Sequence, residues 1–212
     1  MSKGDDDPTM RRVSLVSRHL SSSTPTPTPR ARAPPRASEY RYFVPFQSTW
    51  RDNDMYGHFN NVTYSQYFDS ITNEYLLNEC RMNATTDPIG LIVHSETSFA
   101  SQLAYPEPVV AAVSIATLSR RKIVWNVALF KARYTTTTTT PEGDGGRGEF
   151  GRKVGLVEPP EGKGEGEATA AAWGTMTHVF VERGGERTKV VDALPAKWTE
   201  KLERLVVGET HS

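Results

Sequence analysis

The sequence has 212 residues, enough for one ordinary domain, and its 25 basic and 25 acidic residues cancel. Without a net charge there is no overall field to attract nucleic acid or an anionic membrane surface, so neither is an expected partner. The single cysteine, Cys80, excludes an intramolecular disulfide framework and a cysteine-rich zinc site. No apolar run approaches the roughly 20 residues that span a bilayer, so we expect a soluble protein with no membrane span.

Residues 1–38 are rich in Ser, Thr, Pro and Arg and almost lack large apolar side chains. Such a segment cannot bury enough surface to offset its ordering entropy, so it is predicted to be a disordered tail. Residues 10–38 contain no Asp or Glu, which is typical of a transit peptide, whereas the three aspartates at 5–7 argue against import. We therefore expect a cytoplasmic protein, or a mitochondrial one if translation starts at Met10.

A strand, a long helix and four further strands are predicted after the tail. Residues 40–50 alternate as a strand does. From Val62 onward, apolar side chains recur at spacings of three and four, which predicts a helix with Asn60 or Asn61 as its N-cap. The later strands are predicted at residues 89–99, 109–118, 123–134 and 169–182, and a short amphipathic helix at 196–206. One long helix followed by consecutive strands indicates an antiparallel sheet packed on that helix, an α+β fold.

A second low-complexity stretch, residues 135–167, begins with a threonine run and continues rich in Gly and Glu. This is the composition of a solvated loop, and a loop of this length is unusual inside a compact domain. Because loop-closure entropy grows only logarithmically with length, an insertion between two paired strands is tolerable. The sequence therefore predicts a domain at residues 39–207 that carries this insertion, with a tail at 208–212.

The junction between the first strand and the long helix, residues 50–64, concentrates carboxylates, asparagines, a glycine and a histidine. Its opening resembles an EF-hand calcium loop, but Tyr56 and Thr63 stand where the loop needs oxygen ligands, so no metal site is expected. No Gly-x-Ser-x-Gly elbow is present, and Cys80 lacks the surroundings of known cysteine nucleophiles. What remains is a carboxylate, Asp54, close to a helix N-terminus, where free N–H groups stabilise charge developing on a carbonyl oxygen.

Residues 51–69 resemble the signature of hotdog-fold acyl-CoA thioesterases of the 4-hydroxybenzoyl-CoA thioesterase type. That family carries the pattern Asp-x-x-Gly-His-x-Asn-Asn-x-x-Tyr, which this sequence matches from Asp54 to Tyr64. Residues 103–109, 172–181 and 191–205 resemble the loop before the family's third strand, its last strand and its closing segment. The resemblance therefore extends over residues 40–206, apart from the insertion.

The resemblance implies a hotdog fold, in which a five-stranded antiparallel sheet wraps a long central helix. It also implies a homodimer or homotetramer whose sheets pair edge to edge, which removes the exposed sheet edge, with active sites at the subunit interface. The implied reaction is hydrolysis of an acyl-CoA to a free acid and coenzyme A, without a metal or a bound cofactor.

By the same resemblance, Asp54 is the catalytic carboxylate, acting as nucleophile on the thioester or as general base for water. The backbone N–H of Asn61 is the donor that polarises the carbonyl, with Asn60 as a second candidate. Gly57 lets the turn pass close to the substrate, where a Cβ would intrude.

The other candidate substrate-binding residues each have a structural alternative. His58 is a candidate general base, although the chemistry of the family does not require one. The alternative is that His58 is a structural histidine. Tyr64 lies on the helix stripe, where packing competes with contact to an acyl chain. Arg120, Arg121 and Lys122 suit the phosphates of coenzyme A, and their alternative is a solvated turn. Residues 95–102 receive no role.

Two other functions stay open on the same fold. One is a module that binds acyl-CoA or a lipid without turnover, and the other is a hydratase or dehydratase, for which His58 is the candidate acid or base. A scaffolding role through the tail and the insertion is a third. The sequence does not decide the acyl group, the choice between coenzyme A and acyl carrier protein, or the choice between dimer and tetramer.

Overall fold

The computed structural model describes residues 33–136, 152–156, 167–184 and 189–207. Most of the tail predicted at residues 1–38, the transit peptide predicted within it, and most of the insertion predicted at 135–167 lie outside these ranges, as does the tail at 208–212. No helix among the described residues is long and apolar enough to cross a membrane.

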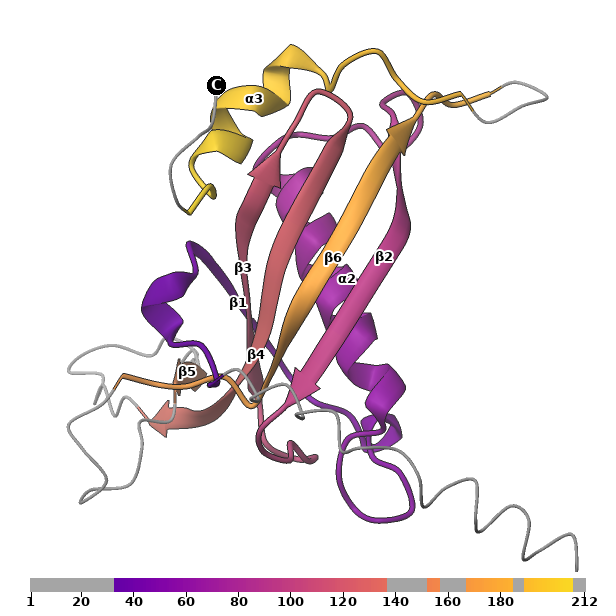
Figure 1. Ribbon diagram of the computed structural model, residues 1–212. Helices are drawn as coiled ribbons and strands as arrows, with labels where there is room; N and C mark the ends of the chain where they lie inside the picture. The colour runs from indigo at the N-terminus through magenta and orange to yellow at the C-terminus, as the bar shows by residue number, and fades with distance from the viewer. Residues whose placement is uncertain (1–32, 137–151, 157–166, 185–188, 208–212) are drawn as a thin grey trace, which may run out of the picture. The chain divides into compact units, whose positions relative to one another are not determined.

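Apart from strand β5, the helices and strands follow the order that the sequence predicts (Figure 1). Two single 3-10 turns lie at Ala37–Glu39 and Trp50–Asp52, before and after the first strand. The helices and strands are β1 (Tyr42–Phe46), α2 (Asn61–Asn78), β2 (Ile89–Phe99), β3 (Val109–Leu118), β4 (Lys122–Thr136), β5 (Arg152–Leu156), β6 (Ala172–Val181) and α3 (Ala196–Glu203).

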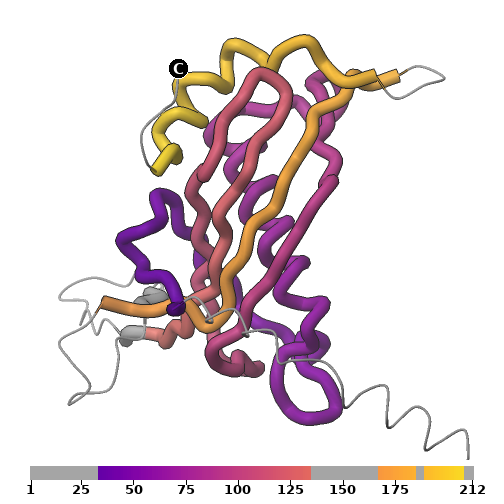
Figure 2. Tube along the Cα trace, in the orientation of Figure 1, coloured from indigo at the N-terminus to yellow at the C-terminus, as the bar shows by residue number. Residues whose placement is uncertain are grey.

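Five antiparallel strands form the main sheet in the order β1-β3-β4-β6-β2. The register aligns Val113 of β3 with Val127 of β4, which in turn faces Gly174 of β6. Helix α2 lies against one face of this sheet, as Figures 1 and 2 show. The predicted α+β hotdog architecture is therefore confirmed.

Strand β5 was not expected, because the insertion has the composition of a loop. It pairs antiparallel with the end of β4, aligning Ala132 with Leu156 and Thr136 with Arg152, and it lies outside the main strand order. The short run Arg-Lys-Val-Gly-Leu is surrounded by glycine-rich sequence, so its alternation is too brief to register as a strand signal.

Helix α2 has the N-cap and the buried apolar face that its sequence predicts. The Asn60 side chain accepts a hydrogen bond from the Val62 N–H at 3.0 Å, which confirms an N-cap at the predicted place. The predicted apolar stripe faces the sheet along most of the helix, whereas Val62 and Asn78 at its two ends are exposed. The buried residues of the stripe are Tyr64, Phe68, Ile71 and Tyr75.

The opposite face of the sheet is covered by the segment before β1. The Ala170 N–H donates to the Pro35 carbonyl at 2.9 Å, and the Ala37 N–H donates to the Ala168 carbonyl at 3.0 Å. Tyr40 packs edge-on against Phe130 of β4, with ring centroids 5.8 Å apart. Ordered structure thus begins before the boundary predicted at residue 38, because backbone pairing supplies what the sparse apolar side chains do not.

Candidate active site

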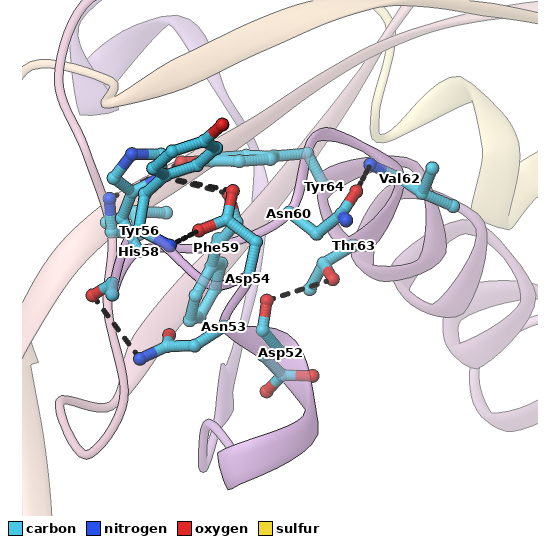
Figure 3. A network of polar contacts seen from close by, with 12 residues as sticks. Asp52, Asn53, Asp54, Tyr56, His58, Phe59, Asn60, Val62, Thr63 and Tyr64 are labelled. Atoms are coloured by element: carbon cyan, nitrogen blue, oxygen red, sulfur yellow. Dashed lines mark hydrogen bonds and ion pairs between the residues drawn. The ribbon is translucent and has the colours of Figure 1, made fainter.

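The residues of the junction motif form a short loop that closes on itself (Figure 3). Asn53 and Phe59 pair as an antiparallel bridge, the Asp54 N–H donates to the His58 carbonyl at 2.9 Å, and the Gly57 N–H donates to the Asp54 carbonyl at 3.2 Å. Gly57 has φ of 82°, a left-handed conformation that glycine adopts without strain. The motif glycine is therefore needed to turn this loop.

The two oxygens of the Asp54 carboxylate have different surroundings. Its Oδ1 accepts a hydrogen bond from the Tyr56 N–H at 2.7 Å, so the turn fixes the plane of the carboxylate. Its Oδ2 lies 3.8 Å from His58 Nδ1, and the Asp54 side chain is 21% exposed. Oδ1 is thus held by the turn, whereas Oδ2 accepts no hydrogen bond from any described residue.

Asp52, to which the sequence assigned no role, attaches this loop to the start of α2. Its carbonyl oxygen accepts hydrogen bonds from the Asn60 N–H at 2.8 Å and from Thr63 Oγ1 at 3.3 Å. Its carboxylate oxygen Oδ2 accepts from the Thr49 N–H at 2.6 Å and from Tyr67 Oη at 2.8 Å. Burial, together with the hydrogen bond to Asp52, raises the pKa of Tyr67 well above its usual 10.0.

The first turn of α2 offers a backbone donor beside this loop. Asn61 is the first helical residue, so its N–H has no acceptor within the helix, and no described residue accepts from it. The helix of 18 residues adds a partial positive charge of roughly half an electron at this end. The arrangement suits an oxygen that carries negative charge.

A pocket of about 210 Å³ opens next to this donor. It brings together the predicted residues His58, Asn61 and Tyr64. Tyr64 is buried and its Oη accepts a hydrogen bond from the Leu103 N–H at 3.3 Å. Burial raises the pKa of Tyr64, the bond from Leu103 opposes that shift, and the negative charge of Asp54 adds to it.

One side of this pocket was not predicted from the sequence. Phe99 at the end of β2 and the three residues that follow it, 100–102, line it. The Phe99 ring meets Tyr64 edge-on with centroids 5.0 Å apart. A strand end that is followed by short polar residues was the available signal, since binding residues commonly lie where strands run into loops.

The remaining predicted substrate-binding residues lie elsewhere in the chain. Asn60 faces a separate recess of about 520 Å³ beside Arg51 and Asp52, where its side chain caps the helix. Arg120, Arg121 and Lys122 lie at the turn between β3 and β4, where the Arg120 carbonyl accepts from the Leu194 N–H just before α3. That turn is at the far end of the ten-residue strand β3, about 30 Å from its start, so within one chain these cations are not beside Asp54.

Within the part of the chain that the structure describes, no group of three or more His, Cys, Asp or Glu residues is placed to hold a metal ion.

Residues 56–136 match the family model of the thioesterase superfamily. The match begins two residues after Asp54 and includes Gly57, His58 and both asparagines of the motif. The curated proteins yield no match.

Solved structures share the fold. The PA5185 protein from Pseudomonas aeruginosa is 27% identical with a TM-score of 0.61, covering 82% of this chain and 97% of that protein. An Asp-to-Asn variant of 4-hydroxybenzoyl-CoA thioesterase, solved with 4-hydroxybenzoyl-CoA, is 18% identical with a TM-score of 0.50, covering 77% of this chain and 97% of its own. A Staphylococcus aureus protein solved with CoA is 11% identical with a TM-score of 0.53, covering 80% of this chain and 88% of its own.

At such identities the last two likenesses concern the fold alone, whereas the family match concerns the sequence around the site. Together they support thioester hydrolysis in general. The matched residues and the shared fold confirm the resemblance of this chain to hotdog-fold thioesterases of the 4-hydroxybenzoyl-CoA type.

Proposed function

We propose that the chain hydrolyses an acyl-CoA thioester to a free acid and coenzyme A, with Asp54 as the reacting carboxylate. The observation that carries this proposal is the pairing of an oriented carboxylate with an unused helix N–H. The Asp54 side chain is 21% exposed, and its Oδ2 lies 3.8 Å from Nδ1 of His58, which lines the same pocket as Asn61. Asp54 does not itself line the pocket, so we propose that a thioester carbonyl bound beside Asn61 is reached by Asp54 from the side of His58.

In the proposed reaction the carbonyl oxygen accepts a hydrogen bond from the Asn61 N–H, which stabilises the negative charge that develops on it. Asp54 Oδ2 either attacks the carbonyl carbon, or takes a proton from a water molecule that attacks it. In both routes the carbon–sulfur bond breaks and the thiolate takes up a proton to leave as coenzyme A. In the first route, water then hydrolyses the acyl–aspartyl anhydride and restores the carboxylate.

Two of the structural neighbours support the choice of ligand and residue. The 4-hydroxybenzoyl-CoA thioesterase was solved with its acyl-CoA as an Asp-to-Asn variant, and the Staphylococcus aureus protein was solved with CoA. An acyl-CoA substrate for this chain is the proposal that follows from that likeness.

We also propose that the protein assembles as a homodimer, or as a homotetramer built from such dimers. Strand β2 ends the strand order, and among the described residues it pairs only with β6. It exposes Leu91, Ile92 and Val93, the last to 61%. An open strand edge with exposed apolar side chains favours pairing with a second copy. Because Phe99 at the end of β2 lines the pocket, the partner would approach the site.

The first test is thiol release from short, long and aromatic acyl-CoA substrates by the parent and by Asp54→Asn. Asparagine retains an oxygen for the bond from Tyr56, so the loop should keep its shape while the negative charge is lost. We expect kcat/KM to fall at least roughly a hundredfold. The matched control is Asp192→Asn, which removes a carboxylate that is 87% exposed and lies near Arg121, and which should keep full activity.

Other outcomes would contradict the proposal. If the parent binds acyl-CoA and releases no thiol, the protein is a binding module. If the products are hydroxyacyl or enoyl thioesters, it is a hydratase or dehydratase, and His58→Ala should then abolish activity. If Asp54→Asn retains parental rates, Asp54 only shapes the turn.

A further inference from the structure

A larger pocket, of about 950 Å³, lies at the same end of the sheet as the candidate active site and has no role in the reaction above. Its walls come from the segment after β1, the loop before β3 and the end of β4, which meet at one end of the sheet in Figure 1. The pocket is lined by residues Gln47, Ser48, 105–108 and 131–134.

Two contacts connect this pocket directly to the active-site loop. The Tyr105 N–H donates to Asn53 Oδ1 at 3.0 Å, and Asn53 immediately precedes Asp54. The Tyr105 ring also meets Trp50 edge-on, with centroids 6.0 Å apart. A ligand in the pocket would therefore lie beside the loop that holds the reacting carboxylate.

Two cations, Lys131 and Arg133, line the pocket. They are alternate residues of β4, so their side chains project from the same face about 7 Å apart along the strand. Both are exposed, and neither forms an ion pair or a hydrogen bond with any described residue. By contrast, Arg121 at the other end of the sheet already faces Asp192, 4.0 Å away.

The remaining polar groups of the pocket do not neutralise this pair. Glu107 is the only acidic residue of the lining, and no ion pair joins it to either cation. Gln47 Nε2 donates to the Ser48 carbonyl at 2.9 Å and to the Pro106 carbonyl at 3.0 Å, so it holds the pocket wall. The pocket thus presents a guanidinium fork and an ammonium group to a ligand.

We propose that this pocket binds the phosphate groups of the coenzyme A portion of the substrate, an inference that rests on the proposed function. Phosphate oxygens match the planar guanidinium fork and attract the ammonium group. The position also fits, because the pocket adjoins the loop of Asp54. A nucleotide held by Arg120, Arg121 and Lys122 of the same chain would instead have to span the length of β3.

Equilibrium binding to the full chain, measured by calorimetry without turnover, tests the proposal. The ligands are CoA, 3′-dephospho-CoA, pantetheine and inorganic phosphate. For the double variant Lys131→Gln with Arg133→Gln, we expect the dissociation constant of CoA to rise roughly tenfold to a hundredfold, because charge-assisted hydrogen bonds are lost. Pantetheine binding should not change.

Two further variants sharpen the comparison. Glu107→Gln removes the one negative charge of the lining, so CoA should bind more tightly to it. The triple variant at Arg120, Arg121 and Lys122, each changed to Gln, tests the competing location. If the triple variant loses CoA binding while the Lys131 and Arg133 double variant keeps it, the proposed pocket is wrong.

The ligand panel separates the sources of phosphate. Tight binding of inorganic phosphate that equals the binding of CoA would mean a site for free phosphate, and would overturn the proposal. Binding of CoA no tighter than that of pantetheine would overturn it as well.

Kinetics separate a failure of this inference from a failure of the proposed function. With an active parent, the double variant should raise KM for acyl-CoA at unchanged kcat, and should leave the hydrolysis of an acyl-pantetheine thioester unchanged. A parent that hydrolyses neither substrate refutes the proposed function, and the calorimetry then still decides whether the pocket binds CoA.

Discussion

The hydrogen bond between Tyr67 and Asp52 allows a quantitative test of how the site is held together. Tyr67 Oη donates to Asp52 Oδ2 at 2.8 Å, and the same oxygen accepts from the Thr49 N–H at 2.6 Å. Through its backbone carbonyl, Asp52 also accepts from the Asn60 N–H at the start of α2. The side-chain bond therefore fixes the peptide that positions the helix N-terminus.

Tyr67→Phe removes this hydrogen bond and little else. The Tyr67 ring packs against Phe46 and Phe59, with centroids 5.4 and 5.8 Å away, and phenylalanine keeps both contacts. A hydrogen bond to a charged group contributes about 1.5–3 kcal/mol, so the free energy of unfolding should fall by about 2 kcal/mol. Asp52→Asn keeps an oxygen that can accept and should lose about 1–2 kcal/mol.

A double-mutant cycle measured by urea unfolding checks this estimate. If the two groups interact as described, the double variant should be less destabilised than the sum of the single variants, by about 1 kcal/mol or more. Additive losses within about 0.3 kcal/mol would show that Tyr67 and Asp52 do not act through one bond. The control is Tyr40→Phe, a buried tyrosine on the opposite face of the sheet, which should be additive with Asp52→Asn.

Three other perturbations have expected outcomes that follow from the structure. Gly174→Ala should lower the free energy of unfolding in urea by more than about 3 kcal/mol, because its Cβ would lie 1.8 Å from the Glu96 carbonyl oxygen. An unchanged unfolding midpoint would show that β2 and β6 do not lie this close together. Burial, and secondly the charge of Glu79, raises the pKa of the Cys80 thiol from 9.0 to about 12. This stabilisation is complete below pH 9 and is lost as pH rises, by about 1.4 kcal/mol per pH unit at most. Cys80→Ala should therefore flatten the decline of the free energy of unfolding between pH 9 and 10, and equal slopes would refute the assignment. Val93→Lys on the open edge of β2 should convert the proposed dimer into monomers in sedimentation, and an unchanged mass would exclude pairing through that edge.

The fold could be predicted well because its signals are local. The spacing of Tyr64, Phe68 and Ile71 defines one buried face of α2, and Asn60 marks the start of the helix within one residue. The predicted strands at residues 89–99 and 109–118 match β2 and β3 because turn residues bound each run. Periodicity and punctuation are properties of neighbouring residues, so no knowledge of the tertiary structure is needed to read them.

The parts that escaped prediction depend on partners far along the chain. The role of Asp52 is set by Tyr67, fifteen residues later, and the pocket wall at Phe99 is set by Tyr64. From the sequence alone, Lys131 and Arg133 have the pattern of a solvent-exposed strand face. In the folded chain the loop before β3 lies opposite them and forms a pocket with them. Sequence patterns report which face a residue occupies, and they do not report what the fold brings to that face.

Two aspartates of the junction, Asp52 and Asp54, have different roles in the site, the first structural and the second proposed to be chemical. The Asp52 carbonyl accepts from the start of α2 and its carboxylate accepts from Tyr67, whereas the Asp54 carboxylate lies 3.8 Å from His58, which lines the pocket. Because the helix is attached through Asp52, Asp54→Asn should abolish hydrolysis and leave the free energy of unfolding nearly unchanged. Asp52→Asn should do the reverse, lowering stability while retaining the reacting group, so its loss of rate should be smaller than that of Asp54→Asn. If both variants lost rate and stability in the same proportion, the loop would act as one structural unit, and Asp54 would have no separate chemical role.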